Sequence, residues 1–226
     1  ADKFKKEING RKIIGVRRIG KNIFIDLSGG KTLYIHLKMT GHLLIKTTNQ
    51  KPRTKNYFND KVNQYIHHIF YLKSGWTLEF SDLRKFGKII LFDTDKIKEA
   101  KEMKSLGIDA MSEDFTFEKF DEILDGKKTK IKLLLMDQSK ITGIGNIYAS
   151  EILFEAGILP SRPAHKIGQE ELKSLYKSIK KVLAKAVELR GTSDSDYRDT
   201  AGAPGKFQKV LKVYRRTGKK CQRCGT

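Results

Sequence analysis

The stretch "DQSKITGIGNIYASEILFEAGILP", residues 137–160, places two glycines directly ahead of an amphipathic helix. The preceding "KIKLLLMDQ" has helical character, so no strand feeds the glycines as it would in a nucleotide-binding loop. We therefore predict a loop between two helices. Glycines there let backbone N–H groups approach an anion at a helix N-terminus, and Asn146 adds a side-chain amide. A tight interhelical turn without a ligand explains the same residues equally well.

Net charge favours the anion site. The chain of 226 residues contains 46 lysines and arginines against 26 aspartates and glutamates, a formal net charge of +20. Such an excess destabilises a compact state by self-repulsion unless a polyanion such as nucleic acid neutralises it. A solvated lysine-rich surface is the alternative. A helix end suited to anions within so basic a chain favours phosphate binding.

Composition also indicates the compartment. The sequence has no run of eighteen apolar residues and no signal-peptide pattern, which predicts a soluble, cytoplasmic protein without membrane contact. Its two cysteines, Cys221 and Cys224, form "CQRC". In the cytosol this spacing is more typical of a metal hairpin than of a disulfide, but a structural zinc needs four ligands. We therefore expect an incomplete zinc site in a chain that is cut, since it also begins with Ala1.

Residues 1 to about 93 are predicted to form strands, because apolar residues recur at every second position. In "KNIFIDL" and "KTLYIHLKM" the alternation is regular, and "SGG" supplies the turn between them. Further strands are predicted in "IHHIFYL", "WTLEF" and "KIILFD". Short antiparallel strands with turn signals indicate a sandwich or barrel. The polar stretch 46–63 is expected to be an exposed loop.

From about residue 97 the apolar period becomes helical, which makes the class α+β. Helices are predicted at 117–124, 130–138, 146–157 and 169–190. The last one has a predicted buried stripe of Leu172, Leu175, Tyr176, Ile179, Val182, Leu183, Ala186 and Val187. A polar loop at 191–208 is long enough to be functional or disordered, and a short strand is expected after it.

Several motifs lie in the order of one known family. They are "RRIGKNIFIDL", "LYIHLKMTGHL", "LEFSDLRKFGKI", "KIKLLLMDQSKITGIGNIYASEILFEAGILPSRPA" and "DTAGAPGKFQKVLKVYRRTGKKCQRCGT". With them the sequence resembles the formamidopyrimidine-DNA glycosylase / endonuclease VIII family of bifunctional base-excision enzymes. The "AGAPGKFQ" loop is similar to the formamidopyrimidine-DNA glycosylase branch, which acts on oxidised purines.

The resemblance implies three regions. They are a β-sandwich catalytic domain at 1–97 lacking its N-terminal helix and first strand, a helix-two-turns-helix domain with a lesion-recognition loop at 98–214, and a partial zinc finger at 215–226. The implied function is DNA repair by a bacterial monomer that removes 8-oxoguanine and formamidopyrimidines from double-stranded DNA and cleaves abasic sites. The implied cofactor is one structural Zn²⁺, held in part by Cys221 and Cys224.

The resemblance also assigns roles to single residues. Lys21 matches a lysine associated with proton transfer near the sugar, although by itself it reads as a solvent lysine. Met39, Arg84 and Phe86 match the trio that fills the space left by an extruded base, although Met39 and Phe86 by themselves suggest core packing.

The other matches are residues that contact DNA. Asn146, with the glycine loop, would hold a phosphate beside the lesion while the nucleotide is turned out of the stack. Lys127 matches a DNA-contacting lysine, with Lys128 as an alternative. His67 matches a DNA-contacting histidine, with Tyr65 or Ile66 almost as close in the alignment.

The sequence departs from the family pattern at both ends. Members begin with a Pro-Glu pair whose proline amine attacks the sugar, whereas this chain begins Ala1-Asp2. The second cysteine pair and the arginine of the finger are also not found, so we expect a scaffold without its nucleophile. A damaged-DNA-binding relative without catalytic activity is one alternative. A ribosomal RNA-binding protein with a similar helical turn is another, but it does not explain "SDLRKFG" and "CQRCG".

Overall fold

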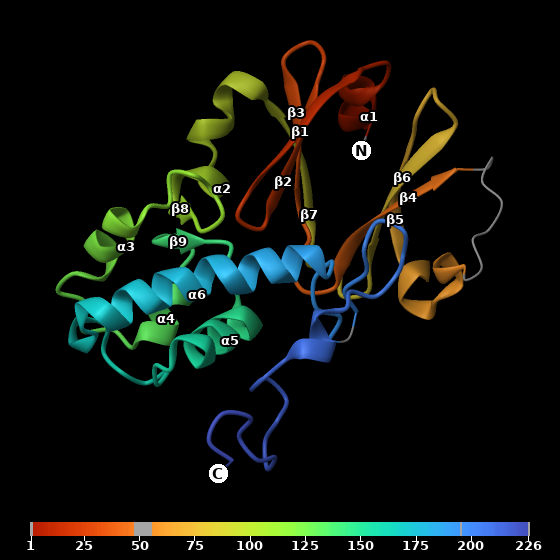
Figure 1. Cartoon of the computed structure of the whole chain (residues 1–226). Coiled ribbons are helices and arrows are strands. Elements are labelled where there is room, and N and C mark those ends of the chain that lie inside the picture. Colours follow the sequence, from red (N-terminus) through yellow and green to blue (C-terminus); the bar gives the residue numbers. More distant parts are fainter. Residues whose placement is uncertain (1, 48–55, 195, 226) are drawn as a thin grey trace. The chain divides into compact units, whose positions relative to one another are not determined.

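The computed structural model of the chain describes residues 2–47, 56–194 and 196–225 and divides them into two compact units. The first unit comprises residues 1–18, 22–95 and 188–209, and the second comprises 19–21, 96–187 and 210–226. Figure 1 shows strands in the first unit and most of the helices in the second. Within the described ranges, no helix is both long and apolar enough to cross a membrane.

The first unit consists of a helix and two antiparallel sheets (Figure 1). Helix α1 spans Asp2–Ile8. One sheet has the order β1 (Ile13–Ile19), β2 (Asn22–Leu27), β3 (Lys31–His36), β7 (Lys88–Asp93). The other has the order β4 (Gly41–Thr47), β6 (Trp76–Asp82), β5 (Ile66–Tyr71). The predicted antiparallel β architecture is thus confirmed.

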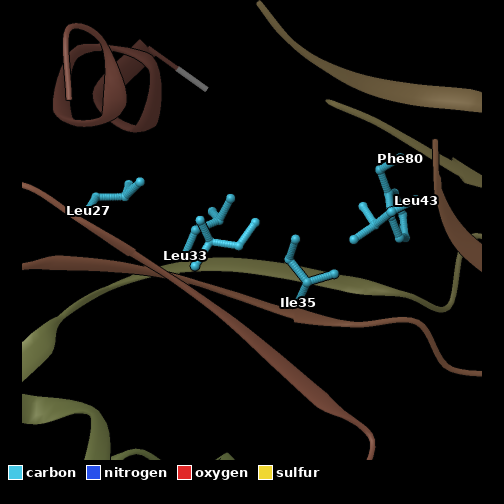
Figure 2. Close-up of a cluster of buried hydrophobic side chains, with 6 residues drawn as sticks. Leu27, Leu33, Ile35, Leu43 and Phe80 are labelled. Carbon is cyan, nitrogen blue, oxygen red and sulfur yellow. The ribbon is translucent and has the colours of Figure 1, made fainter. Parts of the chain in front are cut away.

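The core of this unit is built from side chains of both sheets, as Figure 2 shows. Ile25 of β2 lies opposite Leu33 of β3, and Leu43 of β4 lies opposite Phe80 of β6. All four side chains are buried. Burying each large apolar side chain contributes about 1.5–3 kcal/mol, so this cluster holds the two sheets face to face.

The start of the chain differs from the prediction of strands throughout residues 1–93. Residues Asp2–Ile8 form a helix because Phe4 and Ile8, one helical turn apart, both pack against the sheet core. Strands β1 and β4 both fall within the range 1–93 that was predicted to form strands, although neither was named by its own residues. Most residues of β1 are exposed, so this strand has no inward-outward alternation.

The predicted loop at 46–63 is more ordered than expected. Its last part forms two 3₁₀ turns, Tyr57–Asn59 and Lys61–Gln64, tied together by the buried Asn63. Residues 48–55 of that prediction lie outside the described residues.

The second unit is largely helical (Figure 1). Its α-helices are α2 (Lys101–Lys104), α3 (Phe117–Leu124), α4 (Ile131–Met136), α5 (Asn146–Ala156) and α6 (Gln169–Glu188). Short 3₁₀ helices occur at Ala164–Lys166 here, and at Thr94–Glu99 and Phe207–Val210 near the unit boundaries. Gly126 after α3 and Gly157 after α5 have φ values of 64° and 76°, as expected for glycines that end helices.

Three predictions for this unit need correction. A two-residue strand, β9 (Ile141–Thr142), precedes the glycine loop and pairs in parallel with β8 (Ile108–Asp109), so the loop does not join two helices directly. On α6, Val187 is exposed rather than part of the buried stripe. The strand expected near residues 209–214 is not found among the described residues. The backbone N–H groups of residues 212–214 donate to the Glu151 carboxylate instead of to a neighbouring strand.

The unit boundaries can be compared with the predicted domains. The chain passes from the first unit to the second between residues 95 and 96, close to the predicted division at 97. Residues 188–209, which include most of the predicted lesion-recognition loop, group with the first unit instead of the helical one. The functional division into three domains stays a prediction.

Candidate nucleic-acid interface

Residues 19–21 belong to the second unit because the backbone at Gly20 lies against β9. The Gly20 N–H donates to Asp109 Oδ2 at 2.8 Å. Gly20 has a φ of 58°, and a Cβ atom there would lie 2.1 Å from Thr142 Oγ1. Both facts require glycine at this position. The close approach brings the next residue, Lys21, beside the glycine loop.

Lys21 contacts that loop through its ammonium group. Its Nζ donates to the carbonyl oxygen of Ile144 at 3.0 Å, and Gln138 Nε2 donates to the same oxygen at 2.8 Å. Gln138 Oε1 in turn accepts from the Gly143 N–H at 3.1 Å. Gln138 therefore fixes the shape of the loop from both sides. It was not predicted, although it lies within the stretch 137–160 that first indicated the site.

The end of helix α5 beside Lys21 is suited to an anion. Gly145 is the N-cap residue of this helix and has an extended backbone conformation. Because it is a glycine, it has no side chain that could cap the first N–H groups. Asn146 is the first helical residue and is exposed, and no hydrogen bond of its side-chain amide is found within the described ranges. The first N–H groups of a helix carry partial positive charge. Burial lowers the pKa of Lys21, so this amine releases its proton more readily than a solvent lysine.

Three of the predicted site residues meet in the first unit. Arg84 Nη1 lies 3.4 Å from the Met39 sulfur, and the Arg84 guanidinium lies 4.8 Å from the centre of the Phe86 ring. Met39 is 70% exposed and Phe86 is 55% exposed. These side chains are therefore not core residues, and the alternative of core packing is wrong. We call Met39, Arg84 and Phe86 the wedge.

His67 contacts the backbone of the segment that carries Arg84. It is exposed on β5, and its Nε2 lies 2.8 Å from the backbone carbonyl oxygen of Asp82, two residues before Arg84. The structure thus brings four predicted residues of the first unit to one end of the β4–β6–β5 sheet. Asp82 itself was not predicted, although it stands in the quoted motif "SDLRKFG".

Lys127 lies in the turn that follows α3. Its side chain is exposed, as is that of Lys128, and its backbone carbonyl accepts from the His165 N–H at 2.9 Å. Because both side chains are exposed, Lys127 and Lys128 are equally accessible to a phosphate. The choice between them stays a prediction.

The cysteines lie on a turn near the end of the described chain. The Arg223 N–H donates to Cys221 Sγ at 3.4 Å and the Gly225 N–H donates to the Cys221 carbonyl at 3.0 Å, and both thiols are free of disulfides. Two thiolates are half of a tetrahedral zinc site. The described residues contain no cluster of three or more His, Cys, Asp or Glu suited to a metal, so they do not by themselves fit a closed zinc site.

Comparisons with known proteins agree with these features. The formamidopyrimidine-DNA glycosylase N-terminal domain matches residues 1–89, and the formamidopyrimidine-DNA glycosylase H2TH domain matches residues 106–198. A formamidopyrimidine-DNA glycosylase of Pelotomaculum thermopropionicum is 40% identical over 222 residues, which are 98% of this chain and 77% of that protein. One of Carboxydothermus hydrogenoformans is 39% identical over 223 residues, with coverage of 99% and 77%.

Solved structures show the same likeness. The Lactococcus lactis Fpg in complex with DNA containing an abasic site has a TM-score of 0.84 at 33% identity, covering 100% of this chain and 79% of that one. The Fpg of Thermus thermophilus has a TM-score of 0.82 at 37% identity, with coverage of 96% and 76%. The chain belongs to the formamidopyrimidine-DNA glycosylase family.

Proposed function

We propose that this protein repairs DNA by base excision. It binds double-stranded DNA as a monomer in the bacterial cytoplasm and turns an oxidised purine out of the stack. With a family-type N-terminal proline amine as the nucleophile, which these 226 residues do not contain, it would release the base as a glycosylase and cleave the resulting abasic site as a lyase. The observation that carries the proposal is the hydrogen bond from Lys21 Nζ to the Ile144 carbonyl, because it holds a lysine at an anion-ready helix end.

The phosphate of the lesion strand is the ligand we assign to this helix end. The exposed Asn146 amide and the first N–H groups of α5 offer neutral donors, and Lys21 adds a charge beside them. Contacts of this kind set the register of a protein on DNA without reading its sequence. Lys127 in the turn after α3 provides a further phosphate charge on the same unit.

The wedge is the element we assign to the vacated stack. Exposed apolar side chains such as Met39 and Phe86 lose their contact with water when they enter a base stack. Arg84 brings hydrogen-bond donors for the base left without a partner, and its stacking on Phe86 keeps the guanidinium at the wedge. In the related Lactococcus lactis structures the DNA contains an abasic site or a Fapy-dG lesion.

Lys21 takes the proton-transfer role in the lyase step. Strand cleavage through an imine requires protons to move at the sugar, and a group transfers protons best when its pKa is near the working pH. Burial shifts the pKa of Lys21 in this direction. We do not assign Lys21 as the nucleophile, because its Nζ is engaged with the Ile144 carbonyl.

Binding of the chain to damaged duplex DNA tests the proposal. We expect tighter binding to a duplex with an abasic-site analogue than to the undamaged duplex, and a linear fall of log K with log salt concentration. The fluorescence of a 2-aminopurine placed next to the lesion should increase when the wedge enters the stack, because the base is then less stacked. Equal binding to both duplexes, or a preference for single-stranded RNA, would contradict the proposal.

Release of base separates an enzyme from an inactive relative that only binds damaged DNA. Duplexes with 8-oxoguanine or a formamidopyrimidine are incubated with the protein, and free base is measured by chromatography. Borohydride trapping on a pre-formed abasic site reports the imine separately. Because these 226 residues lack the N-terminal Pro-Glu pair, the same assays are run with that segment restored. Lesion-specific binding by this longer chain without base release or trapping would favour the inactive relative.

We further infer that Cys221 and Cys224 contribute two of the ligands of a structural zinc. The metal would supply folding free energy to the turn 221–225 and no step of the reaction. With two thiolates alone we expect well under one zinc per chain after dialysis, measured by mass spectrometry of the metal. A stoichiometric zinc would show that other ligands, such as His165 or a second chain, complete the site.

A further inference from the structure

Asp82 occupies an unusual position at the end of strand β6. Its side chain is fully buried, yet no lysine or arginine side chain neutralises it through an ion pair among the described residues. Instead its carboxylate accepts hydrogen bonds from three donors, one hydroxyl and two backbone N–H groups. Oδ1 accepts from the Thr40 hydroxyl and from the Arg84 N–H at 3.3 Å, and Oδ2 accepts from the Gly87 N–H at 2.7 Å.

These donors come from two separate turns. Thr40 directly follows Met39 in the turn before β4, whereas Arg84 and Gly87 enclose Phe86 in the turn between β6 and β7. The Thr40 hydroxyl also lies 3.1 Å from the Arg84 N–H, which links the turns a second time. One carboxylate therefore connects the two segments that carry the wedge.

Both turns have a strained backbone directly before a wedge residue. Lys38 precedes Met39 with a φ of 55°, and Lys85 precedes Phe86 with a φ of 57°. A non-glycine residue in this conformation persists only where the surrounding structure fixes it. The hydrogen bonds to Asp82 and the bond from the Gly41 N–H to the Leu37 carbonyl at 3.0 Å surround these positions.

We propose that Asp82 is the positioning residue of the wedge, which holds Met39, Arg84 and Phe86 in one arrangement for entry into the base stack. The inference rests on the proposed function of the wedge. It predicts that loss of the Asp82 contacts reduces the preference for damaged DNA and leaves phosphate binding by the second unit intact. Asp82 itself touches no DNA in this role, because it is buried.

The charge state of Asp82 agrees with this role. Burial alone would raise its pKa, but the Thr40 hydroxyl and the N–H groups of Gly87 and Arg84 outweigh burial and hold the pKa below its ordinary value. The carboxylate is thus ionised and accepts from every donor at neutral pH.

Asp82→Asn is the first test. An amide has one acceptor oxygen in place of two, so either the Thr40 hydroxyl or the Gly87 N–H loses its partner. We expect the ratio of affinities for abasic-site and undamaged duplexes to fall about tenfold or more, as for a lost hydrogen bond to a charged group. The salt slope of binding to undamaged duplex should not change, and the 2-aminopurine signal at saturating protein should be lost.

Thr40→Val provides a second test if the asparagine variant does not fold. It breaks the connection to the turn of Met39 and leaves the backbone donors of the other turn in place. Thr40→Ser keeps the hydroxyl and should restore the ratio to within about twofold. Thr77→Val is the matched control, because Thr77 donates a similar bond to Glu79 at 3.0 Å near the opposite end of β6.

The outcomes separate this inference from the proposed function. If the unmodified chain does not distinguish the two duplexes, the proposed function fails. If the unmodified chain does distinguish them and Thr40→Val distinguishes them equally well at saturation, the positioning role of Asp82 is wrong. Equal losses in Thr40→Val and Thr77→Val would show a general destabilisation and would also overturn it.

Discussion

In the function we propose, the two units bind different parts of DNA with different parts of the chain. In the second unit the proposed anion site is made mainly of backbone: the glycine loop, the first turn of α5, and a carbonyl shared by Lys21 and Gln138. In the first unit the wedge is made of three exposed side chains, and a buried carboxylate at Asp82 connects their two turns.

The difference follows from the ligands. Every nucleotide has a phosphate, so a site of backbone N–H groups serves all sequences and needs only glycines that allow close approach. A stack vacated by one base must be filled by side chains of the correct size, and these are exposed to water until DNA arrives. Exposed apolar side chains on strained turns need a buried group such as Asp82 to hold the turns in place, whereas a glycine loop does not.

Gly20→Ala is expected to have the largest effect, because the backbone site depends on close approach. The new Cβ would meet Thr142 Oγ1 at 2.1 Å in addition to the left-handed φ of 58°. Left-handed strain and overpacking together should cost about 2–4 kcal/mol of unfolding free energy. Urea unfolding measures this loss of unfolding free energy. Binding of abasic-site DNA should also weaken, because Lys21 moves away from the glycine loop.

Gly10→Ala is the control for this substitution. Gly10 has a φ of 73°, but a Cβ there would have no atom within 4 Å. It should therefore show only the conformational cost, about 1 kcal/mol. If both variants lose equal stability, the approach of Gly20 to β9 is not what requires glycine.

Phe86→Ala is expected to act on the wedge alone. Phe86 is 55% exposed, so its loss should change stability by less than about 1 kcal/mol. The preference for abasic-site over undamaged duplex should fall about tenfold, because a ring that stacks on a base contributes about 1–3 kcal/mol. The salt slope should stay the same. Tyr71→Ala, at an aromatic residue 80% exposed on β5, is the control and should leave the preference unchanged.

Much of this fold could be predicted from the alternation of apolar residues. The pairing of Ile25 with Leu33 and the buried face of α6 follow from periods of two and 3.6 residues. Edge strand β1 was covered only by the general prediction for residues 1–93, because the adjacent pairs Ile13-Ile14 and Arg17-Arg18 break the period of two. Helix α1 was missed because it is short and because only Phe4 and Ile8 pack on the sheet.

Part of the candidate site could be named before the fold was known. Lys21, Arg84 and Asn146 were named because their motifs resemble those of the family, and their roles stay predictions. Asp82 and Gln138 could not be named, because each acts by bonding to backbone atoms that only the folded chain brings close. Residues that position others thus depend on tertiary distance, to which sequence spacing gives no direct guide.

Lys21→Ala should have a moderate effect and distinguishes the two sites by charge. Removing one phosphate-contacting charge should lower the salt slope by about one and weaken binding to all duplexes alike. The preference for abasic-site DNA should be reduced much less than in Phe86→Ala. Lys119→Ala, at an exposed lysine of α3 in the same unit, is the control. A loss confined to damaged DNA would show that Lys21 acts only at the lesion, in its proton-transfer role, and would contradict the phosphate contact.

Glu155→Gln should have the smallest effect and compares the carboxylates of the two units. Glu155 accepts from Lys181 and from Lys212 at 2.7 Å, and these bonds hold its pKa at about 2 instead of 4.5. Because the pKa is lowered in the folded state, the stabilisation is complete above pH 4.5 and is lost as the pH falls towards 2.

The expected loss at neutral pH is only about 1 kcal/mol or less, since the Lys181 side chain is 71% exposed and water screens the pair. Urea unfolding of the unmodified chain and of Glu155→Gln across this pH range should show that their difference in unfolding free energy becomes smaller as the pH falls. Added salt should also reduce this difference. Asp82→Asn should respond little to salt, because Asp82 is buried and bonded to neutral donors. A difference at Glu155 that persists in strong salt would mean that this carboxylate, too, acts as a buried anchor.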